Sequence, residues 1–530
     1  MTAPFLLLIL VFVYQRTLIF LKLTACKRET IAVTQLPGEQ AAMEVESKKE
    51  NGVLGAEQTI SLYQKQAKIY ARSVSGWWST WRWVFVFLTQ AIFYGTPWLQ
   101  WNDRQAVLFH LVERKFYLFG LVLWPQDVFY LALLLIISAY ALFLFTAVAG
   151  RLFCGYACPQ TVYTEIFMWV EEKVEGTRSA RMKLDKEPMG GRKLRLKLTK
   201  HAAWLMISLI TGLTLVAYFT PVVELKQSLL SGELGSWEVF WIFFYGGFTY
   251  LQAGFMREQV CKYMCPYARF QSVMFDPDTL IITYDPVRGE PRGARQKSEA
   301  SSAHGDCVDC GICVQVCPMG IDIRKGLQYE CIGCGACIDA CDVVMDKIGL
   351  PKGLIRYTTE NVLVQESDEA RQRGKGCRTE SENLSALFIL KQNIRRPRII
   401  LYSVILVVLL ALTAVSMAVR IPLKVDLIRD RSSLAREADD GRIENVYTMK
   451  IMNATEQAHV YSIQVSGLEG IALASEAQVS VEPASNLEFT ANLRVPEGVA
   501  PKGSYPVYFD VQAQDDAKIR VHEKASFILP

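Results

Sequence analysis

The chain has 530 residues, 51% of them hydrophobic, and its mean hydropathy of +0.17 excludes a wholly soluble protein. The formal net charge of +4 gives no support to nucleic-acid binding, and we expect no nucleic-acid partner. The 14 Cys do not read as a disulfide framework, because most of them lie in two clustered motifs and two close pairs.

Residues 1–42 form an N-terminal extension for which two interpretations stay open. Its segment 5–23 is apolar, but a Gln-Arg pair interrupts it and no basic residue precedes it, so it fits a signal peptide poorly. The segment is either a sixth membrane span or a start-site extension. We favour the extension, with Met43 as the true first residue and residues 43–80 as a cytoplasmic segment.

Several segments are apolar over the length of about 20 residues that a helix needs to cross a bilayer. They are residues 81–99, 128–148, 202–219, 237–256 and 399–418. The first four define a membrane region at 81–256, and the last defines a fifth helix at 399–419. The apolar run 116–124 is too short to cross, so we expect it to be buried or interfacial. An aromatic belt at the membrane interface, with helix packing as the alternative, is indicated by Trp77, Trp78, Trp81 and Trp83.

The distribution of Lys and Arg predicts the orientation. Residues 151–201 carry 11 of them, whereas residues 221–236 carry one, so the first loop is expected in the cytoplasm and the second outside it. Alternation of the spans then places residues 43–80 and 257–398 inside and residues 420–530 outside. The basic stretch 178–200 either sets this topology or provides a landing surface for an acidic electron donor.

The membrane region contains a duplicated motif. The first two spans lead into CGYACP at 154–159, and the next two lead into CKYMCP at 261–266. Both hairpins run in the same direction, so we expect parallel repeats related by an axis along the membrane normal. The two cysteine pairs would then lie at the same depth, just inside the cytoplasmic face.

The two pairs are candidates for a thiol site that binds copper or passes electrons onward. Residues four apart share one face of a helix, and the Pro after each second Cys favours the start of a new helix. A thiol near a helix N-terminus tends to have a lowered pKa, and thiolate with thioether is the soft donor set that selects Cu(I). Ordinary packing of Cys and Met in a helix bundle is the alternative. The candidates are Cys154, Cys158, Cys261, Met264 and Cys265.

A segment at 257–398 carries two C-x2-C-x2-C-x3-C runs, the spacing that holds paired [4Fe–4S] clusters and sends the fourth Cys of each run to the other cluster. Structural zinc and disulfides are the alternatives, but zinc sites usually use two C-x2-C pairs. Cluster 1 is assigned to Cys307, Cys310, Cys313 and Cys341. Cluster 2 is assigned to Cys331, Cys334, Cys337 and Cys317. Close backbone approach and positive φ are expected at Gly311, Gly333 and Gly335.

Two further regions complete the chain. Residues 353–391 are polar, and we interpret them as a loop over the cluster domain with Cys377 as an unligated thiol. From Val446 to Leu529 apolar residues alternate with polar ones between Gly, Pro and Asn turns, which predicts an immunoglobulin-like β-sandwich. The alternation is clearest at Tyr447, Met449, Ile451, Val507, Phe509, Val511, Ile519 and Val521.

Beside the paired cluster motif and the sandwich tail, four stretches form a recognisable pattern, namely CGYACPQTVYTE, GFMREQVCKYMCPYARFQSVMFD, YDPVRGEPRG and KGLIRYTTEN. With them the chain resembles the FixG/RdxA/CcoG family of cytochrome oxidase accessory proteins from about Tyr70 to Pro530. NosR- and NapH-like membrane polyferredoxins share the CxxxCP pairs and the cluster runs but do not combine GEPRG and LIRYTTEN with this tail.

The resemblance implies a multi-pass protein of the bacterial inner membrane that assists assembly of a cbb3-type oxidase by reducing Cu(II) to Cu(I). The expected fold is a five-helix membrane region of two parallel-repeat hairpins and one helix, a bacterial-type dicluster ferredoxin domain and a periplasmic immunoglobulin-like domain. The preferred hypothesis is therefore a cupric reductase with two [4Fe–4S] clusters and copper at the paired thiols. The alternative is an electron conduit or assembly scaffold with no substrate of its own.

The expected partners follow from these assignments. They are membrane lipid, a cytoplasmic electron donor, oxidase assembly factors or copper chaperones, and a second copy of the chain.

Overall fold

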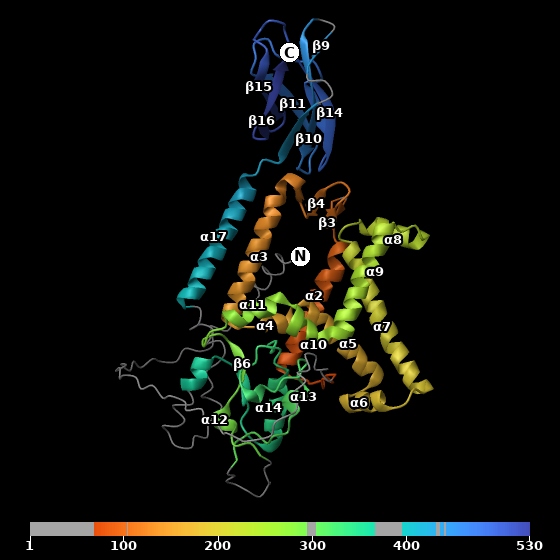
Figure 1. Ribbon diagram of the computed structural model, residues 1–530, viewed down its shortest axis with the longest axis vertical. Coiled ribbons are helices and arrows are strands. Elements are labelled where there is room, and N and C mark those ends of the chain that lie inside the picture. The colour runs from red at the N-terminus through yellow and green to blue at the C-terminus, as the bar shows by residue number, and fades with distance from the viewer. Residues whose placement is uncertain (1–67, 103, 294–303, 366–394, 431–434, 439–440) are drawn as a thin grey trace, which may run out of the picture. The chain divides into compact units, whose positions relative to one another are not determined.

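The computed structural model describes residues 68–102, 104–293, 304–365, 395–430, 435–438 and 441–530 (Figure 1). The chain divides into a unit Met1–Ile69 and a unit Tyr70–Pro530, and the described residues belong almost wholly to the second. The expectations for the N-terminal extension and for Cys377 lie outside the described residues.

Long apolar helices occupy the positions of the predicted spans. They are α2 (Trp77–Gly95), α3 (Val128–Ala149), α7 (Gly191–Val216), α9 (Ser236–Leu251) and α17 (Pro397–Val419). Within the described residues, three stretches are long and apolar enough to cross a membrane, namely Pro125–Ala149, Gly191–Val216 and Pro397–Val419. These three support a membrane protein, whereas the count of five spans stays a prediction. The predicted fourth span is an α-helix only as far as Leu251 and continues as the π-helix η3 (Gln252–Met256).

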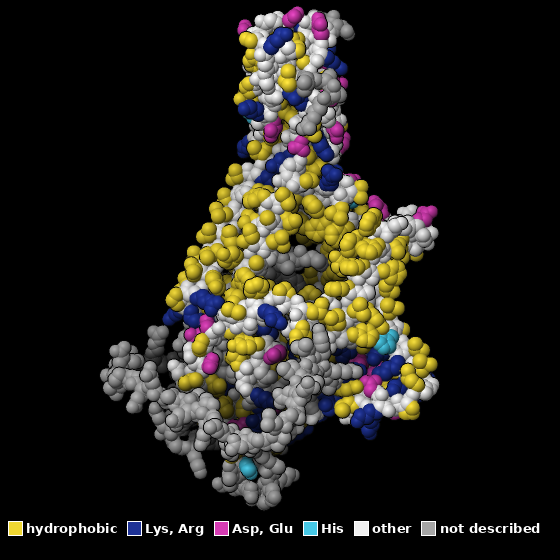
Figure 2. Space-filling model, in the orientation of Figure 1, with side chains coloured by type: hydrophobic (Ala, Val, Ile, Leu, Met, Phe, Trp, Pro, Cys, Tyr) yellow, Lys and Arg dark blue, Asp and Glu magenta, His cyan; other side chains and the backbone are white. Residues whose placement is uncertain are grey.

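Hydrophobic side chains gather on the surface over α3, α17, α7 and α9 (Figure 2). Helices α3 and α17 run side by side, and Tyr130 on α3 lies 3.0 Å from the hydroxyl of Ser416 on α17. Helices α7 and α9 approach closely because Gly212 and Gly246 face one another. A Cβ on Gly212 would lie 2.4 Å from the carbonyl oxygen of Ile242, so no larger residue fits there.

The segment between α2 and α3 contains short strands. They are β1 (Gln100–Trp101), β2 (Arg104–Gln105), β3 (Val107–His110), β4 (Lys115–Leu118) and β5 (Leu121–Leu123). Strands β3, β4 and β5 form one antiparallel sheet, so the apolar run 116–124 is strand and its Trp124 is buried. Strands β1 and β2 form a separate two-stranded sheet, and Glu456 of the C-terminal domain accepts hydrogen bonds from its residues Trp101 (3.0 Å) and Arg104 (2.8 Å).

Short helices surround the two cysteine pairs, between the apolar helices and the cluster domain (Figure 1). They are α4 (Leu152–Tyr156), α5 (Pro159–Glu175), α6 (Arg178–Lys186), α10 (Arg257–Gln259), the π-helix η4 (Val260–Met264) and α11 (Pro266–Met274). A further short helix, α8 (Val222–Ser231), precedes α9. Pro159 and Pro266 each take the first position of a new helix, as predicted, because their missing N–H would have no partner there.

The cluster domain begins and ends with a strand, and both cysteine runs lie between these two strands. Its elements are β6 (Ile281–Tyr284), α12 (Pro286–Gly289), α13 (Ile312–Gln315), η5 (Ile323–Lys325), α14 (Ala336–Ile348) and β7 (Ile355–Thr358). Strands β6 and β7 pair antiparallel, with Ile282 opposite Tyr357. The interpretation of residues 353–391 as a loop is wrong at its start, since Leu354 and Ile355 are buried in the domain core.

The C-terminal domain is a sandwich of two antiparallel sheets, as predicted. One sheet has the order β12-β14-β10-β8, with β9 paired to β10, and the other has the order β13-β11-β15-β16. The strands are β8 (Leu423–Arg429), β9 (Arg436–Glu437), β10 (Ile443–Asn453), β11 (His459–Ser466), β12 (Ala472–Leu473), β13 (Gln478–Val481), β14 (Asn486–Val495), β15 (Gly503–Ala513) and β16 (Arg520–Leu529). Strands β8 and β9 precede the residue at which the alternation was expected to begin.

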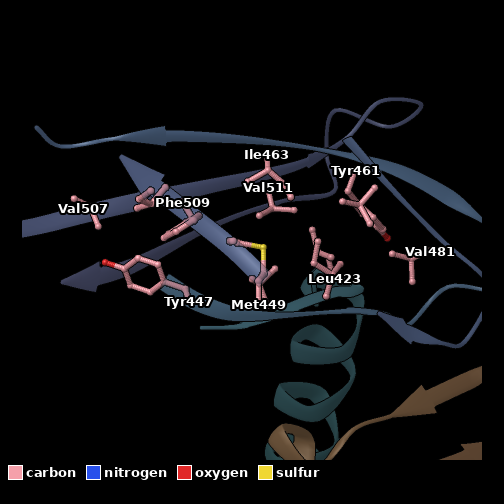
Figure 3. Packing of buried hydrophobic residues seen from close by; sticks show 14 of the residues in the cluster. Leu423, Tyr447, Met449, Tyr461, Ile463, Val481, Val507, Phe509 and Val511 are labelled. Carbon is pink, nitrogen blue, oxygen red and sulfur yellow. The ribbon is translucent and has the colours of Figure 1, made fainter. Parts of the chain in front are cut away.

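The core of the sandwich comes from alternate residues of facing strands. Tyr447 and Met449 of β10 point toward Phe509 and Val511 of β15 (Figure 3). The predicted inward positions of β10 and β15 are all buried, whereas Val521 is only partly buried.

Candidate metal centres

Four cysteines from the two runs line one cavity of the cluster domain. They are Cys307, Cys310, Cys313 and Cys341, the set assigned to cluster 1. Apolar side chains such as Ile312 and Met345 complete the wall. Cys310 is exposed, whereas Cys307 and Cys313 are buried, so this cavity comes close to the protein surface.

A second cavity is lined by Cys317, Cys331, Cys334 and Cys337, the set assigned to cluster 2, together with Cys313. The remaining wall is apolar and includes Ile282, Ile321 and Ile323. None of the four assigned cysteines is exposed. The chain thus brings Cys317 to the thiols of the later run and Cys341 to those of the earlier run.

The donor set of both cavities fits an iron–sulfur cluster. Each cavity contains the four thiols assigned to its cluster, and thiols are the ligands that clusters of this type use. The other residues around the second cavity are apolar, whereas Arg324 and Tyr284 also line the first. Gly311, Gly333 and Gly335 have φ of 63°, 64° and 74°, as expected for loops that wrap closely around a bound group. A Cβ on Gly335 would also lie 2.6 Å from Cβ of Trp78.

The two cysteine pairs lie where short helices break. Cys154 is on α4, and Cys158 is the extended residue before α5, with φ −65° and ψ 127°. Cys261 is on the π-helix η4, and Cys265 is the extended residue before α11, with φ −76° and ψ 111°. The two repeats therefore differ on the N-terminal side of the motif, where one is α-helical and the other is π-helical.

The structure brings the two pairs together and places them beside the second cavity. The thiols of Cys154, Cys158 and Cys261 are close enough to influence one another's ionisation. Cys154 and Cys261 also pack against the apolar cluster that contains Met319 and Cys334. Residues from two helix breaks and from the cluster domain thus lie together. Because they are far apart in the chain, no short sequence pattern could predict this contact.

Helix α4 touches the loop of the second cavity through its backbone. A Cβ on Gly155 would lie 2.8 Å from the carbonyl oxygen of Ile332 and 2.9 Å from that of Gly333. The hydroxyl of Tyr156 donates a hydrogen bond of 3.3 Å to the carbonyl oxygen of Cys334. A glycine at position 155 therefore permits the closest approach between the Cys154 pair and the second cavity.

The helix that leads to the second pair is strained. Arg257 lies between the π-helix η3 and the π-helix η4 and has φ +32°, a conformation that costs a non-glycine residue on the order of 1–3 kcal/mol. Its guanidinium is 3.0 Å from the buried carboxylate of Glu171, and its carbonyl oxygen accepts a 3.2 Å hydrogen bond from Gln160. π-Helical turns of this kind occur frequently at functional sites.

The expectation of a lowered thiol pKa is wrong for this site. Burial raises the pKa of Cys154 to about 12, with a further rise from Cys158, and burial raises that of Cys261 to about 12 as well. Backbone N–H groups of Gln160 and Thr161 do lower the pKa of Cys158, as a helix N-terminus should, but burial raises it more.

Met264 does not share the setting of the thiols. Its side chain is 52% exposed, and the thioethers beside Cys261 belong instead to Met168 and Met319. Among the residues that the structure describes, no three His, Cys, Asp or Glu side chains form a group that could hold a single metal ion. The paired thiols are therefore not a preassembled site of that kind.

The first helix is held by a carboxylate of the cluster domain. Helix α2 begins after Gly76, which has no side chain to cap it, and Asp339 on α14 accepts hydrogen bonds from Trp78 N–H (3.2 Å) and Ser79 N–H (2.7 Å). The ring of Trp78 packs against Tyr357 at 4.5 Å. Trp78 is thus a packing residue between α2 and the cluster domain, which was the alternative to the aromatic belt.

We expect Asp339→Ala to lower stability by about 1 kcal/mol, the usual cost of losing an N-cap, because two N–H groups at the start of α2 lose their acceptor. Asp339→Asn keeps an acceptor and should cost less. The measurement is loss of cluster absorbance on heating in detergent. Equal losses for the two variants would contradict a capping role.

Comparisons with known proteins agree with this architecture. A family model described as a 4Fe-4S dicluster domain matches residues 256–360, and one described as the IG-like fold at the C-terminus of FixG matches residues 413–530. The nitrogen fixation protein FixG of Rhizobium meliloti is 36% identical over 422 residues, covering 77% of this chain and 80% of that one. The chain belongs to the FixG family.

Two other relatives cover still more of the chain. Protein RdxB of Cereibacter sphaeroides is 39% identical over 82% of this chain and 88% of its own length. Protein RdxA of the same organism is 38% identical over 87% of this chain and 95% of its own. The family resemblance found in the motifs is confirmed, and with it an iron–sulfur redox protein.

One match concerns a part of the chain outside the cluster domain. A family model described as a 4Fe-4S binding domain matches residues 131–176. This range contains α4, the whole of α5 and the pair Cys154 and Cys158. The first cysteine pair therefore belongs to a segment of iron–sulfur type by sequence.

Proposed function

We propose that this member of the FixG family is a membrane-bound cupric reductase that passes electrons from two [4Fe–4S] clusters to Cu(II) and releases Cu(I). The observation that carries the proposal is the backbone contact of α4, the helix of Cys154, with the loop of the second cavity at Ile332 and Gly333. Soft thiols next to a cluster loop suit a metal ion that is reduced from Cu(II) to Cu(I).

The eight cysteines of the two cavities hold the clusters in this proposal, with Cys317 and Cys341 crossing between the runs. When bound, the clusters supply one-electron transfer at potentials set largely by burial and hydrogen bonding. The apolar wall of the second cavity would exclude water from the group bound there, and the glycines at positive φ let backbone N–H groups approach both groups.

Electrons are proposed to arrive on the side of Cys310, the only exposed thiol of the eight assigned ligands, all of which the structure describes. A soluble cytoplasmic one-electron donor fits that position. Cys154 and Cys261 pack beside residues of the second cavity, so a cluster held by Cys317, Cys331, Cys334 and Cys337 would be the one next to the copper site, and a cluster held by Cys307, Cys310, Cys313 and Cys341 would be the one next to the donor. Each electron converts one Cu(II) to one Cu(I), and no atom is transferred to or from the protein.

We also propose where the protein is located and which partners it has. The cluster domain faces the cytoplasm of a bacterial inner membrane, and the sandwich faces the periplasm. Copper chaperones or assembly factors of a cbb3-type oxidase take the Cu(I) to the oxidase copper centre. The relationship to the FixG family supports this assignment. The electron donor is defined here only as a soluble one-electron carrier.

The test uses purified full-length protein with its clusters, reduced chemically under anaerobic conditions. We expect added Cu(II) to appear as Cu(I) bound to a chromogenic chelator, at a rate that falls at least about tenfold when Cys154, Cys158, Cys261 and Cys265 are all changed to Ser, because the donor groups for the soft ion are gone. Cys377→Ser serves as the control thiol. An unchanged rate in the fourfold variant, with both clusters retained, would reduce the pairs to packing residues.

A second candidate is favoured by the iron–sulfur match at residues 131–176. In this candidate the four paired thiols hold a further cluster, and the protein is an electron conduit without a substrate of its own. Iron analysis of anaerobically purified protein separates the two. The reductase predicts about eight iron atoms per chain, whereas a third four-iron cluster predicts about twelve.

A further inference from the structure

Two neighbouring cavities share a wall that contains a buried ion pair between α2 and α5. The outer cavity has a volume of about 100 Å³, and its wall includes Arg72, Ser73 and Glu172. The inner cavity has a volume of about 20 Å³, and its wall includes Cys261. Both cavities are lined by Arg82, Glu165, Met168 and Pro318. Arg82 and Glu165 form an ion pair, with 7% and 16% of their side chains exposed.

The inner cavity has the size and the lining of a site for one small soft ion. A volume of about 20 Å³ holds roughly one water-sized ligand, which excludes an organic redox partner such as a quinone or a flavin. Cys261 contributes a thiol, and Met168 and Met319 belong to the wall and carry thioethers, which are ligands that prefer soft metal ions. The guanidinium groups of Arg82 and Arg257 also line this cavity, and each is paired with a carboxylate, that of Glu165 or Glu171. Pro318, which follows Cys317, and Ile332, which follows Cys331, also line this cavity, so an ion in it lies next to residues that neighbour two ligands assigned to cluster 2.

The ion pair lies in the wall that the two cavities share. Glu165 reaches both of them, and its charge is neutralised by Arg82. Removing one partner of a buried ion pair leaves an uncompensated charge, so a guanidinium leaves such a carboxylate readily only when another cation replaces it. A metal cation in the outer cavity can provide that replacement. Glu172, which accepts a 2.6 Å hydrogen bond from Ser73, adds a second carboxylate to the outer wall.

We propose that the two cavities form the access route of the metal ion to Cys261 and that the Arg82–Glu165 pair is its gate. An incoming cation takes the place of Arg82 on Glu165, and the displaced guanidinium turns to the carboxylate of Glu172 in the outer wall. The cation then loses its remaining water and moves to the sulfur ligands of the inner cavity. The inference rests on the proposed function, because it names the route by which the substrate of that site arrives. It assigns a positioning role to Arg82 and a cation-binding role to Glu165.

The test measures access without copper turnover. Full-length protein with oxidised clusters is mixed with Cd²⁺ alone, and protection of Cys261 from N-ethylmaleimide is followed by peptide mass spectrometry. Glu165→Gln should slow protection by about tenfold, because the cation loses its attracting charge at the gate. Arg82→Gln should accelerate it, because the carboxylate is freed. Iron content and thermal stability are recorded for every variant, and rates are compared at equal cluster content.

The matched control is Asp127→Asn. Asp127 forms a buried ion pair with Arg420 at 2.5 Å, away from both cavities, so its variant should leave the rate at Cys261 unchanged. Opposite shifts for the two gate variants support the route, whereas shifts in the same direction, or none, overturn it. If the two gate variants shift the rate in opposite directions but the protein does not reduce Cu(II), the access route is supported and the proposed reductase is contradicted. If the protein reduces Cu(II) but neither variant changes the rate of protection by Cd²⁺, the reductase is supported and the access route is contradicted.

Discussion

Changing Cys317 to Ser is expected to remove cluster 2 and spare cluster 1, although Cys317 belongs to the first cysteine run. The reason is geometric, because the thiol of Cys317 lines the cavity of Cys331, Cys334 and Cys337. Changing Cys341 to Ser should remove cluster 1 instead, since its thiol lines the cavity of Cys307 and Cys310. Each variant should keep about four of roughly eight iron atoms.

The identity of the surviving cluster decides the assignment. The cavity that includes the exposed Cys310 should lose iron to a chelator sooner than the cavity whose assigned cysteines are all shielded. The cluster left in Cys317→Ser is therefore expected to be the chelator-sensitive one, and the cluster left in Cys341→Ser the resistant one. Cys377→Ser should retain both. If instead each run keeps its own cluster, the sensitivities of the two variants are reversed and the crossed assignment fails.

The sequence was informative wherever a short pattern determines local geometry. The glycines at positive φ in the cluster loops, the new helices after Cys158 and Cys265, and the alternation along β10 and β15 all follow from residues a few positions apart. Backbone conformation and the inward face of a strand are set at that range, so these features were predictable.

Features set by distant contacts were not predictable in the same way. The capping of α2 by Asp339 joins residues 260 or more positions apart, and β6 pairs with β7 across both cysteine runs. The thiol pKa was misjudged for a related reason. A helix N-terminus is visible in the sequence, whereas the burial that outweighs it arises from packing against the cluster domain.

The π-helices illustrate a third kind of omission. The sequence predicts a span that ends at Met256, and nothing in the composition of residues 252–264 indicates η3, η4 or the positive φ of Arg257. This conformation depends on the buried carboxylate of Glu171 and on Gln160 of α5, which hold Arg257 from another part of the chain. The weak available signal was a Gln at the second position of a helix that starts with Pro159.

Changing Gly155 to Ala is expected to separate the Cys154 pair from the second cavity. The new Cβ would meet the carbonyl oxygens of Ile332 and Gly333 and, at 3.0 Å, the Cα of Cys334. These are backbone atoms that cannot rotate away, so α4 or the loop must move. Overpacking of this kind typically costs about 1–3 kcal/mol, and Gly155→Val should cost more. The measurements are iron retention on heating and the rate of Cu(II) reduction.

A matched glycine separates this effect from a general response to substitution. A Cβ on Gly247 of α9 would meet nothing within 4 Å, so Gly247→Ala should be neutral or stabilise the helix by up to about 1 kcal/mol. Because electron transfer weakens steeply with distance, the Gly155 variant should reduce copper more slowly even at temperatures where both clusters remain bound. Full reduction rates in a Gly155→Val protein with intact clusters would mean that electrons do not leave through α4, and the contact would then be structural only.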